Sequence, residues 1–319
     1  MLKVLRNLIV ILYDAIIRDG SFILKNYIPF SIKKQKDRYV FMVDGKIPHG
    51  GMFDRLKGAV SVYAVTKSLG KEFKIYFVYP FDLRKYIEPN QYDWTIDEDE
   101  LCFHFPAARP VRAYGEYKHP IRLWKERKGE THFYYGYDSL DKINAHFGTS
   151  YQWGELYREL FRPTHQLQLL IDNYKAEIGG RYMVVHMRFL NLLGDKVETE
   201  INPELSAEDK QELIKQCYGK MEELMRESGL RVMLASDSMT FIHYALNRCP
   251  QIYVVPGTVK HIDTAGTTSD DDNLKMFVDY HLIASAEKVY NIVGKGMWSS
   301  AFSEYPAMIG NGSFERIFI

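Results

Sequence analysis

The sequence predicts an α/β protein built from two doubly wound parallel sheets. Two observations lead to this fold class. From residue 181 to about residue 309, short apolar runs of strand length alternate with segments of helical periodicity. A strand, glycine turn, helix, strand order occurs earlier, between residues 38 and 78. The chain of 319 residues is long enough for two such domains.

The first domain is predicted to span residues 38–155. Its opening strand leads into a loop that ends in Gly50 and Gly51, where a ligand can approach the main chain closely. Residues 80–130 show no strong periodicity and are predicted to form loops and short elements. The predicted strands are 38–43, 73–78 and 131–137, and the predicted helices are 52–70 and 138–147. Two further helices, 153–160 and 163–176, are predicted around the domain boundary.

The second domain, residues 156–319, has the more regular pattern. One of its helices begins at Ser206, which together with Asp209 forms a signal similar to a capping box. The predicted strands are 181–187, 230–235, 251–255 and 288–293. The predicted helices are 206–228, 238–248, 273–287 and 299–309.

Residues 1–37 are predicted to form an N-terminal amphipathic helix and a lead-in. Apolar residues share one helical face in this segment: Leu5, Leu8, Ile9, Leu12 and Ile16. A helix packed on its own protein is the commoner arrangement of this kind. Because basic residues surround the segment, peripheral membrane contact through residues 1–36 is the alternative. The apolar run is shorter than the roughly 20 residues of a membrane span, and no signal-peptide cleavage site follows.

The charge balance and the cysteines restrict the partners and the compartment. Lysine plus arginine and aspartate plus glutamate both number 41, so no net field favours nucleic acid as a partner. The three cysteines, Cys102, Cys217 and Cys249, lack the spacing of a metal site. They are typical of reduced thiols, so we expect a cytoplasmic protein.

Polar residues follow three of the predicted strands of the second domain. His186 and Arg188 end the first strand, Asp237 ends the second, and Gly294 to Ser303 follow the last. In an open parallel sheet, ligands bind at this carboxyl edge. The planar, permanently charged fork of arginine suits phosphate oxygens. A helix that starts near Ser299 would add free main-chain amides for a phosphate group.

Each of these features also has a purely structural interpretation. Arg188 could pair with a carboxylate of a surface helix, and Asp237 could be a charge at a helix start. Ser299 and Ser300 could be N-caps only. The acidic run 270–272 could hold a metal ion, but its place before a helix favours helix-start charges, so no metal site is expected.

Four stretches of the chain, in this order, resemble motifs of the GDP-fucose-dependent fucosyltransferases. That superfamily includes the bacterial nodulation α-1,6-fucosyltransferases and the protein O-fucosyltransferases. The match extends over about residues 38–310. The stretches are Gly50-Gly-Met-Phe-Asp-Arg-Leu-Lys-Gly58, similar to GG-x-x-N-R-L; His186-Met-Arg188, similar to H-x-R; Leu234-Ala-Ser-Asp237; and Ser300-Ala-Phe-Ser303, similar to S-x-F-S.

The resemblance implies a GT-B fold, in which two Rossmann-like domains face a cleft. Residues 38–155 would be the acceptor-side domain and residues 156–319 the nucleotide-sugar domain. It also implies an inverting, metal-independent enzyme without a cofactor, which moves fucose from GDP-fucose to a hydroxyl of a glycan acceptor. We expect this reaction to serve polysaccharide biosynthesis.

The resemblance also assigns roles to individual residues. Arg188 would contact the β-phosphate of the donor, with His186 beside it. The other donor-binding residues it implies are Gly50, Gly51, Arg55, Asp237, Ser300, Phe302 and Ser303.

The general base stays open. His49 and Asp54 in the glycine loop are the first candidates, and Asp44 and Glu198 come next.

The chain departs from the family pattern at three positions. Phe189 stands where a second basic residue often follows H-x-R, Asp54 replaces the turn asparagine, and Phe53 replaces a glycine. Two alternatives therefore stay open. One is a GT-B glycosyltransferase with another nucleotide-sugar donor, and the other is a non-catalytic nucleotide- or carbohydrate-binding protein of the same fold.

Overall fold

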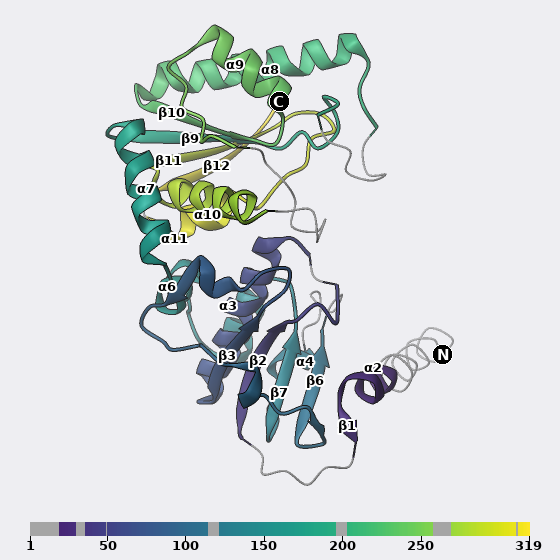
Figure 1. Cartoon of the computed structure of the whole chain (residues 1–319). Helices are drawn as coiled ribbons and strands as arrows, with labels where there is room; N and C mark the ends of the chain where they lie inside the picture. Colours follow the sequence, from purple (N-terminus) through teal and green to yellow (C-terminus); the bar gives the residue numbers. More distant parts are fainter. Residues whose placement is uncertain are drawn as a thin grey trace. The chain divides into compact units, whose positions relative to one another are not determined.

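The computed structural model describes residues 19–29, 36–48, 50–113, 121–195, 203–257, 269–310 and 312–319. The chain divides into two compact α/β units, each with a four-stranded parallel sheet (Figure 1). The predicted fold class is therefore confirmed. Unit 1 consists of Met1–Leu83, Pro89–Gln152 and Glu159–Phe161, and unit 2 of Arg84–Glu88, Trp153–Arg158 and Arg162–Ile319.

The sheet of unit 1 has the strand order β3-β2-β7-β6. Its strands are β2 (Arg38–Val43), β3 (Glu72–Phe77), β6 (Ala108–Arg112) and β7 (Glu130–Tyr134). All adjacent pairs are parallel. The chain runs from β2 to β3 on one side and later places β7 on the other, so β2 and β7 flank a topological switch point. The strand β6 lies in a region that was predicted to form loops and short elements.

The long helix α3 (Met52–Leu69) covers this sheet and is buried over most of its length. Gly51 is its N-cap, and Gly70, with φ of 63°, ends it in the left-handed conformation that glycine adopts easily. At Gly58 a Cβ atom would lie 2.2 Å from the carbonyl oxygen of Tyr135. The helix therefore lies directly against the chain that follows β7.

A buried ion pair joins the starts of β2 and β7. Arg38 Nε lies 2.7 Å from Glu130 Oε2, and both side chains are almost fully buried. Burial alone would raise the pKa of Glu130, but hydrogen bonds from His132 and the Cys102 amide, together with Arg38, hold that pKa below its usual value. A buried carboxylate with these partners stays ionised and fixes the strand register.

The described part of the N-terminal lead-in packs on unit 1. The rings of Phe22 and Tyr134 lie 5.4 Å apart, and the Tyr27 hydroxyl is 2.7 Å from His132 Nδ1. Residues 1–18, which carry most of the predicted amphipathic helix, lie outside the described residues. The remaining elements up to residue 163 are α2 (Asp19–Asn26), α4 (Ile121–Trp124), α5 (Leu140–Phe147), α6 (Trp153–Leu160), β1 (Ile28–Pro29) paired with β5 (His104–Phe105), β4 (Ile87–Pro89) paired with β8 (Phe161–Pro163), and the 3-10 turns Leu83–Lys85 and Glu98–Glu100.

The sheet of unit 2 has the order β10-β9-β11-β12, with every adjacent pair parallel. Its strands are β9 (Tyr182–Met187), β10 (Arg231–Ser236), β11 (Lys288–Val293) and β12 (Ser313–Phe318). The strand predicted at 251–255 is wrong, because Tyr253 makes only a single bridge with Met233. The strand β12 was not predicted.

Helices cover both faces of this sheet. The helices α8 (Ala207–Ser228) and α9 (Met239–Arg248) lie on one face, and α10 (Asp270–Ser285) and α11 (Glu304–Ile309) lie on the other (Figure 1). A further helix, α7 (His165–Ile178), leads into β9. As predicted, α8 begins after Ser206, whose hydroxyl accepts a hydrogen bond from the Asp209 amide. The helix predicted from Ser299 begins only at Glu304, so that prediction is wrong in its start.

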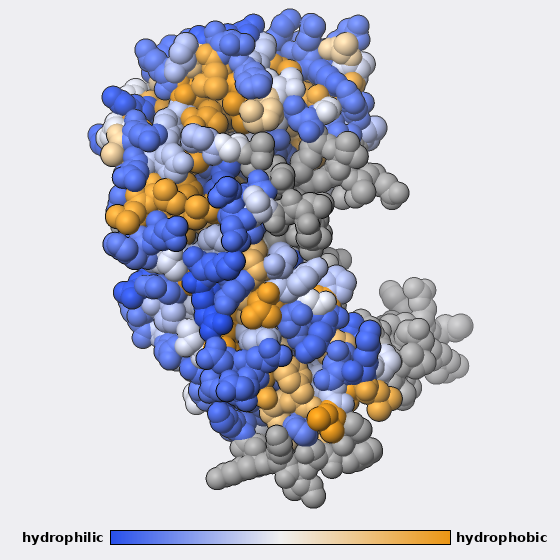
Figure 2. Space-filling model, in the orientation of Figure 1, coloured by the Kyte–Doolittle hydropathy of each residue, from blue (hydrophilic) through white to orange (hydrophobic). Residues whose placement is uncertain are grey.

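No helix of the described residues is long and apolar enough to cross a membrane. The face of the molecule drawn in Figure 2 is mostly hydrophilic, with smaller apolar patches. All three cysteines are free thiols.

Candidate functional site

The carboxyl edge of the unit 2 sheet has the topology of a ligand site. The chain passes from β9 to β10 on one side and then places β11 on the other side of β9. Strand order therefore reverses between β9 and β11, and in open α/β sheets ligands bind at such a point. Arg188 follows the end of β9, and the segment 294–303 follows the end of β11. Arg188 and the segment 294–303 thus border the switch point, whereas Asp237 follows β10, one strand away.

Asp237 holds the loop that carries Arg188. One carboxylate oxygen of Asp237 accepts a hydrogen bond from the Phe189 amide at 2.7 Å, and the other accepts one from the Leu190 amide at 2.9 Å. Leu190 has φ of 56°, and it is the one non-glycine residue of the described chain with positive φ. Such a conformation costs on the order of 1 kcal/mol and needs support. These two hydrogen bonds to Asp237 thus support the arginine loop.

His186 is a buried, neutral residue of this edge. Its Nδ1 lies 2.9 Å from the Ser303 hydroxyl, and it is 6% exposed. Burial, and then the nearby charges of Arg188 and Arg316, lower its pKa to about 3. A histidine with such a pKa carries no charge near neutrality, so it contributes a hydrogen bond at this point of the sheet and no charge for a phosphate.

Arg316, which was not singled out from the sequence, extends this polar row across the sheet. His186 and Arg316 are both in register with Asn291, on the strands to either side of β11. Arg316 Nε donates to Asn291 Oδ1 at 3.1 Å, and its Nη2 pairs with Glu304 at 2.7 Å. Only the strand register of β12, which was not predicted, brings Arg316 here.

The segment after β11 is a turn that leads to two buried serines, Ser300 and Ser303. Ser300 Oγ accepts a hydrogen bond from the Phe302 amide at 3.1 Å, and Ser303 bonds to His186. The Phe302 ring lies 5.4 Å from the His186 ring. Both serine side chains are buried. The predicted serines therefore lie at this edge, and the contacts of their hydroxyls stay within the chain.

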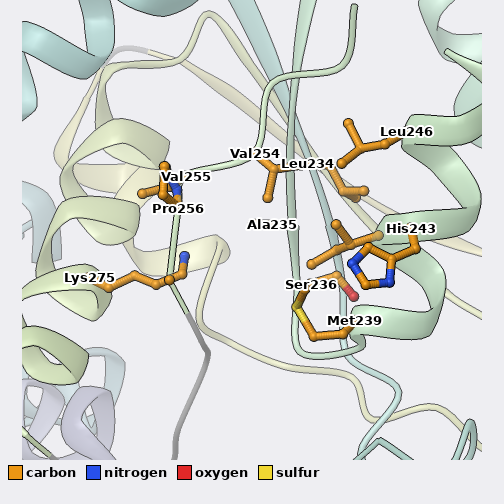
Figure 3. Close-up of a pocket in the computed structure, with 12 residues that line it drawn as sticks. Leu234, Ala235, Ser236, Met239, His243, Leu246, Val254, Val255, Pro256 and Lys275 are labelled. Carbon is orange, nitrogen blue, oxygen red and sulfur yellow. The ribbon is translucent and has the colours of Figure 1, made fainter. Parts of the chain in front are cut away.

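A pocket of about 230 Å³ opens at the end of β10. In Figure 3 Lys275 extends from α10 on one side, next to the segment with Val255 and Pro256, and His243 projects from α9 on the other side. Most of the remaining wall is apolar, and Ser236 supplies a hydroxyl. A flat, apolar-faced ring with polar edges fits such a lining.

Lys275 also pairs with a buried carboxylate. Its Nζ lies 2.7 Å from Asp279 Oδ2, whereas Asp279 Oδ1 is buried without a hydrogen-bond partner among the described residues. Burial raises the pKa of Asp279, and Lys275 opposes that rise. A buried carboxylate oxygen without a donor is costly, and the pairing of the other oxygen with Lys275 offsets part of that cost. From the sequence, Asp279 was recognised only as part of a helix.

The glycine loop belongs to unit 1. Arg55 is buried and donates to the carbonyl oxygens of Gly50 and Tyr79, at 3.0 and 2.9 Å, which closes the loop. Asp54 pairs with Lys57 at 2.5 Å, with 39% of its side chain exposed. A Cβ atom at Gly51 would meet no other atom within 4 Å, so the main chain there is open. His49 and Glu198 lie outside the described residues.

The acidic run Asp270–Asp272 opens α10, as the helix-start interpretation predicted. Asp272 and Ser269 form a capping box, and Asp270 pairs with Lys85 at 3.2 Å. Among the described residues, no group of three or more histidine, cysteine, aspartate or glutamate side chains could hold a metal ion.

The chain has a GT-B fold and is similar in structure to fucosyltransferases of that fold. No protein-family model matches the chain, and no curated protein matches it by sequence. The fucosyltransferase NodZ from Bradyrhizobium superposes with a TM-score of 0.59 at 17% identity, over 86% of this chain and 94% of that one. NodZ α-1,6-fucosyltransferase co-crystallised with GDP gives a TM-score of 0.58 at 15% identity, over 86% of this chain and 93% of that one. A variant of Arabidopsis thaliana FUT1 in complex with GDP gives a TM-score of 0.55 at 10% identity, over 94% of this chain and 74% of that one.

Proposed function

We propose that this chain is an inverting glycosyltransferase that moves fucose from GDP-fucose to a hydroxyl group of a glycan acceptor. The observation that carries the proposal is the place of Arg188. It follows β9 at the switch point of a sheet whose fold is that of fucosyltransferases, some of them solved with GDP. No cofactor or metal ion is part of the proposal, and the GDP-sugar is a substrate.

The mechanism that we propose is a single displacement at the anomeric carbon of the donor sugar. Negative charge builds on the departing diphosphate, and the Arg188 guanidinium stabilises it. The loop that Asp237 holds keeps this cation in place before the reaction, so little reorganisation is needed in the transition state. Removing one such contact typically costs about 100–1000-fold in rate.

The pocket beside β10 is the proposed site of the nucleotide base. Its apolar wall suits the faces of a purine, and about 230 Å³ is enough for a base. Ser236, His243 and Lys275 line the same pocket and would supply polar groups for the edge of the base.

The acceptor proton needs a general base, and Asp54 is our candidate among the described residues. Its side chain is partly exposed beside Gly50, although it also pairs with Lys57. His49 is the other candidate from the same loop. We place the enzyme in the cytoplasm, because its free thiols suit a reducing compartment.

Two measurements test the proposal. A thermal-shift panel of GDP, UDP, ADP and CMP should show stabilisation by GDP above the other nucleotides. Transfer or hydrolysis of GDP-fucose should then fall at least about 100-fold in Arg188→Ala, with Arg181→Ala, an exposed arginine of the same unit, as the matched control. Activity of Arg188→Ala within a few-fold of the parent would refute the assignment. Stabilisation by UDP in place of GDP would point to another nucleotide-sugar donor.

A further inference from the structure

The loop after β11 carries an exposed tryptophan that the proposed function does not use. Trp298 is 49% exposed, whereas Trp94 and Trp153 are 1% and 5% exposed. Single exposed apolar side chains are ordinary on protein surfaces, so exposure alone decides nothing. The attachment of Trp298 and its position relative to Arg188 are the features that distinguish it.

Buried neighbours fix the backbone on both sides of Trp298. Met297 is buried, its Sδ accepts a hydrogen bond from the Gly294 amide at 3.1 Å, and it lies 3.7 Å from Cys217 Sγ. Ser300, two residues after Trp298, is buried as well. The exposed indole therefore projects from a loop that is packed down at both ends. Little conformational freedom is lost when such a side chain binds a ligand.

The Trp298 backbone is tied to the phosphate-binding residue of the proposed site. Its amide donates to the Arg188 carbonyl oxygen at 3.2 Å. In a nucleoside-diphosphate sugar, the sugar ring begins one oxygen atom beyond the β-phosphate. Because the backbones of Arg188 and Trp298 are in direct contact, a phosphate held by Arg188 would bring the sugar ring close to the segment that carries the exposed indole.

We infer that Trp298 packs against the apolar face of the donor sugar and so strengthens the binding of the sugar part of the donor; this inference rests on the proposed function. A 6-deoxyhexose carries a methyl group where other hexoses carry a hydroxymethyl group, and an indole ring covers such apolar surface well. Covering roughly 50 Å² of apolar surface corresponds to about tenfold in affinity. The nucleoside diphosphate alone has no sugar ring and gains nothing from Trp298.

Isothermal titration of the full chain with GDP and with GDP-fucose tests this inference. In Trp298→Ala the Kd for GDP-fucose should rise about tenfold, while the Kd for GDP stays within about twofold of the parent. Trp298→Phe should keep most of the affinity, because it retains an aromatic face. Leu169→Ala is the matched control, since Leu169 is 52% exposed on α7 of the same unit, and it should change neither Kd.

The outcomes separate this inference from the proposed function. Equal Kd values for GDP-fucose in Trp298→Ala and the parent, or equal weakening of GDP and GDP-fucose, overturn the role of Trp298 and leave the proposed function standing. The role of Trp298 is also overturned if the parent chain binds GDP and GDP-fucose with the same Kd. Failure of the parent to bind either compound overturns the proposed function, and this inference falls with it.

Discussion

The Asp237 carboxylate should determine whether the Arg188 loop is formed, and Asp237→Ala tests this. The substitution removes both acceptors of the Phe189 and Leu190 amides, at 2.7 and 2.9 Å. Hydrogen bonds to a charged group contribute roughly 1.5–3 kcal/mol each. Leu190, with φ of 56°, then loses the support for a conformation that costs on the order of 1 kcal/mol. The loop should leave its present conformation.

If about 2–3 kcal/mol of that loss must be recovered when the ligand binds, GDP affinity should fall roughly 30- to 150-fold. Hydrogen exchange of the Phe189 and Leu190 amides gives a readout that needs no ligand, and both should exchange faster in Asp237→Ala. Asp237→Asn should have an intermediate effect, because one amide oxygen can still accept while its NH₂ group faces a main-chain donor.

Asp195→Asn is the matched control for this experiment. Asp195 is a carboxylate of the same sheet edge, but it bonds to the first turn of α9, where its Oδ1 accepts from the Thr240 amide at 3.0 Å. The Asp195→Asn substitution should lower the thermal stability and leave the GDP affinity within about threefold of that of the parent. The reasoning is refuted if Asp237→Ala keeps parental GDP affinity and slow amide exchange, or if Asp195→Asn weakens GDP equally.

Three further predictions concern stability. The pKa of His186 is about 3 in the folded chain against about 6.5 in the unfolded chain. The contribution of neutral His186 to the free energy of unfolding is therefore complete above about pH 6.5 and is lost as the pH falls towards 3. Denaturant unfolding should show that the free energy of unfolding depends less on pH in His186→Asn than in the parent. Glu130→Gln leaves Arg38 buried without its anionic partner, and thermal unfolding should reveal a loss of about 3 kcal/mol. Gly58→Ala places a Cβ atom 2.2 Å from a main-chain oxygen and should lower the Tm by several degrees, whereas Gly219→Ala on α8, with no atom within 4 Å, should raise it slightly.

The strands of the four-stranded sheets that could be predicted from the sequence are rich in apolar residues, as in β9 (YMVVHM). The two strands of these sheets that were missed have a different composition. The strand β12, with the sequence SFERIF, mixes charged and apolar residues at the edge of its sheet, and β6, with the sequence ARPVR, contains Pro110 and two arginines. An edge strand needs only one hydrogen-bonding partner and tolerates both features. Tyr253 shows the reverse case, because its apolar surroundings suggested a strand where only one bridge forms.

The places of the candidate site residues in the fold could be predicted in part, whereas their contacts could not. A polar residue after a buried strand signals the sheet edge, which is why Arg188 and Asp237 were found. The contact between Asp237 and the arginine loop joins positions 47 and 48 residues apart, and no local pattern encodes it. The burial of Asp279 and its pairing with Lys275 were not predicted, because only the packing of α10 reveals them.

Phe189 illustrates how packing explains a departure from a family pattern. It is fully buried, its ring lies 5.0 Å from that of Phe241, and it belongs to the apolar core of unit 2. A lysine or arginine with this side-chain direction would place an unpaired charge in that core, at a cost of several kcal/mol. The Asp237 carboxylate accepts from the amide of this same residue, so the loop cannot easily turn the side chain outward without losing that bond. In the proposed function the loop after β9 therefore supplies one cation, Arg188, and we expect any second positive charge for the diphosphate to come from another part of the chain.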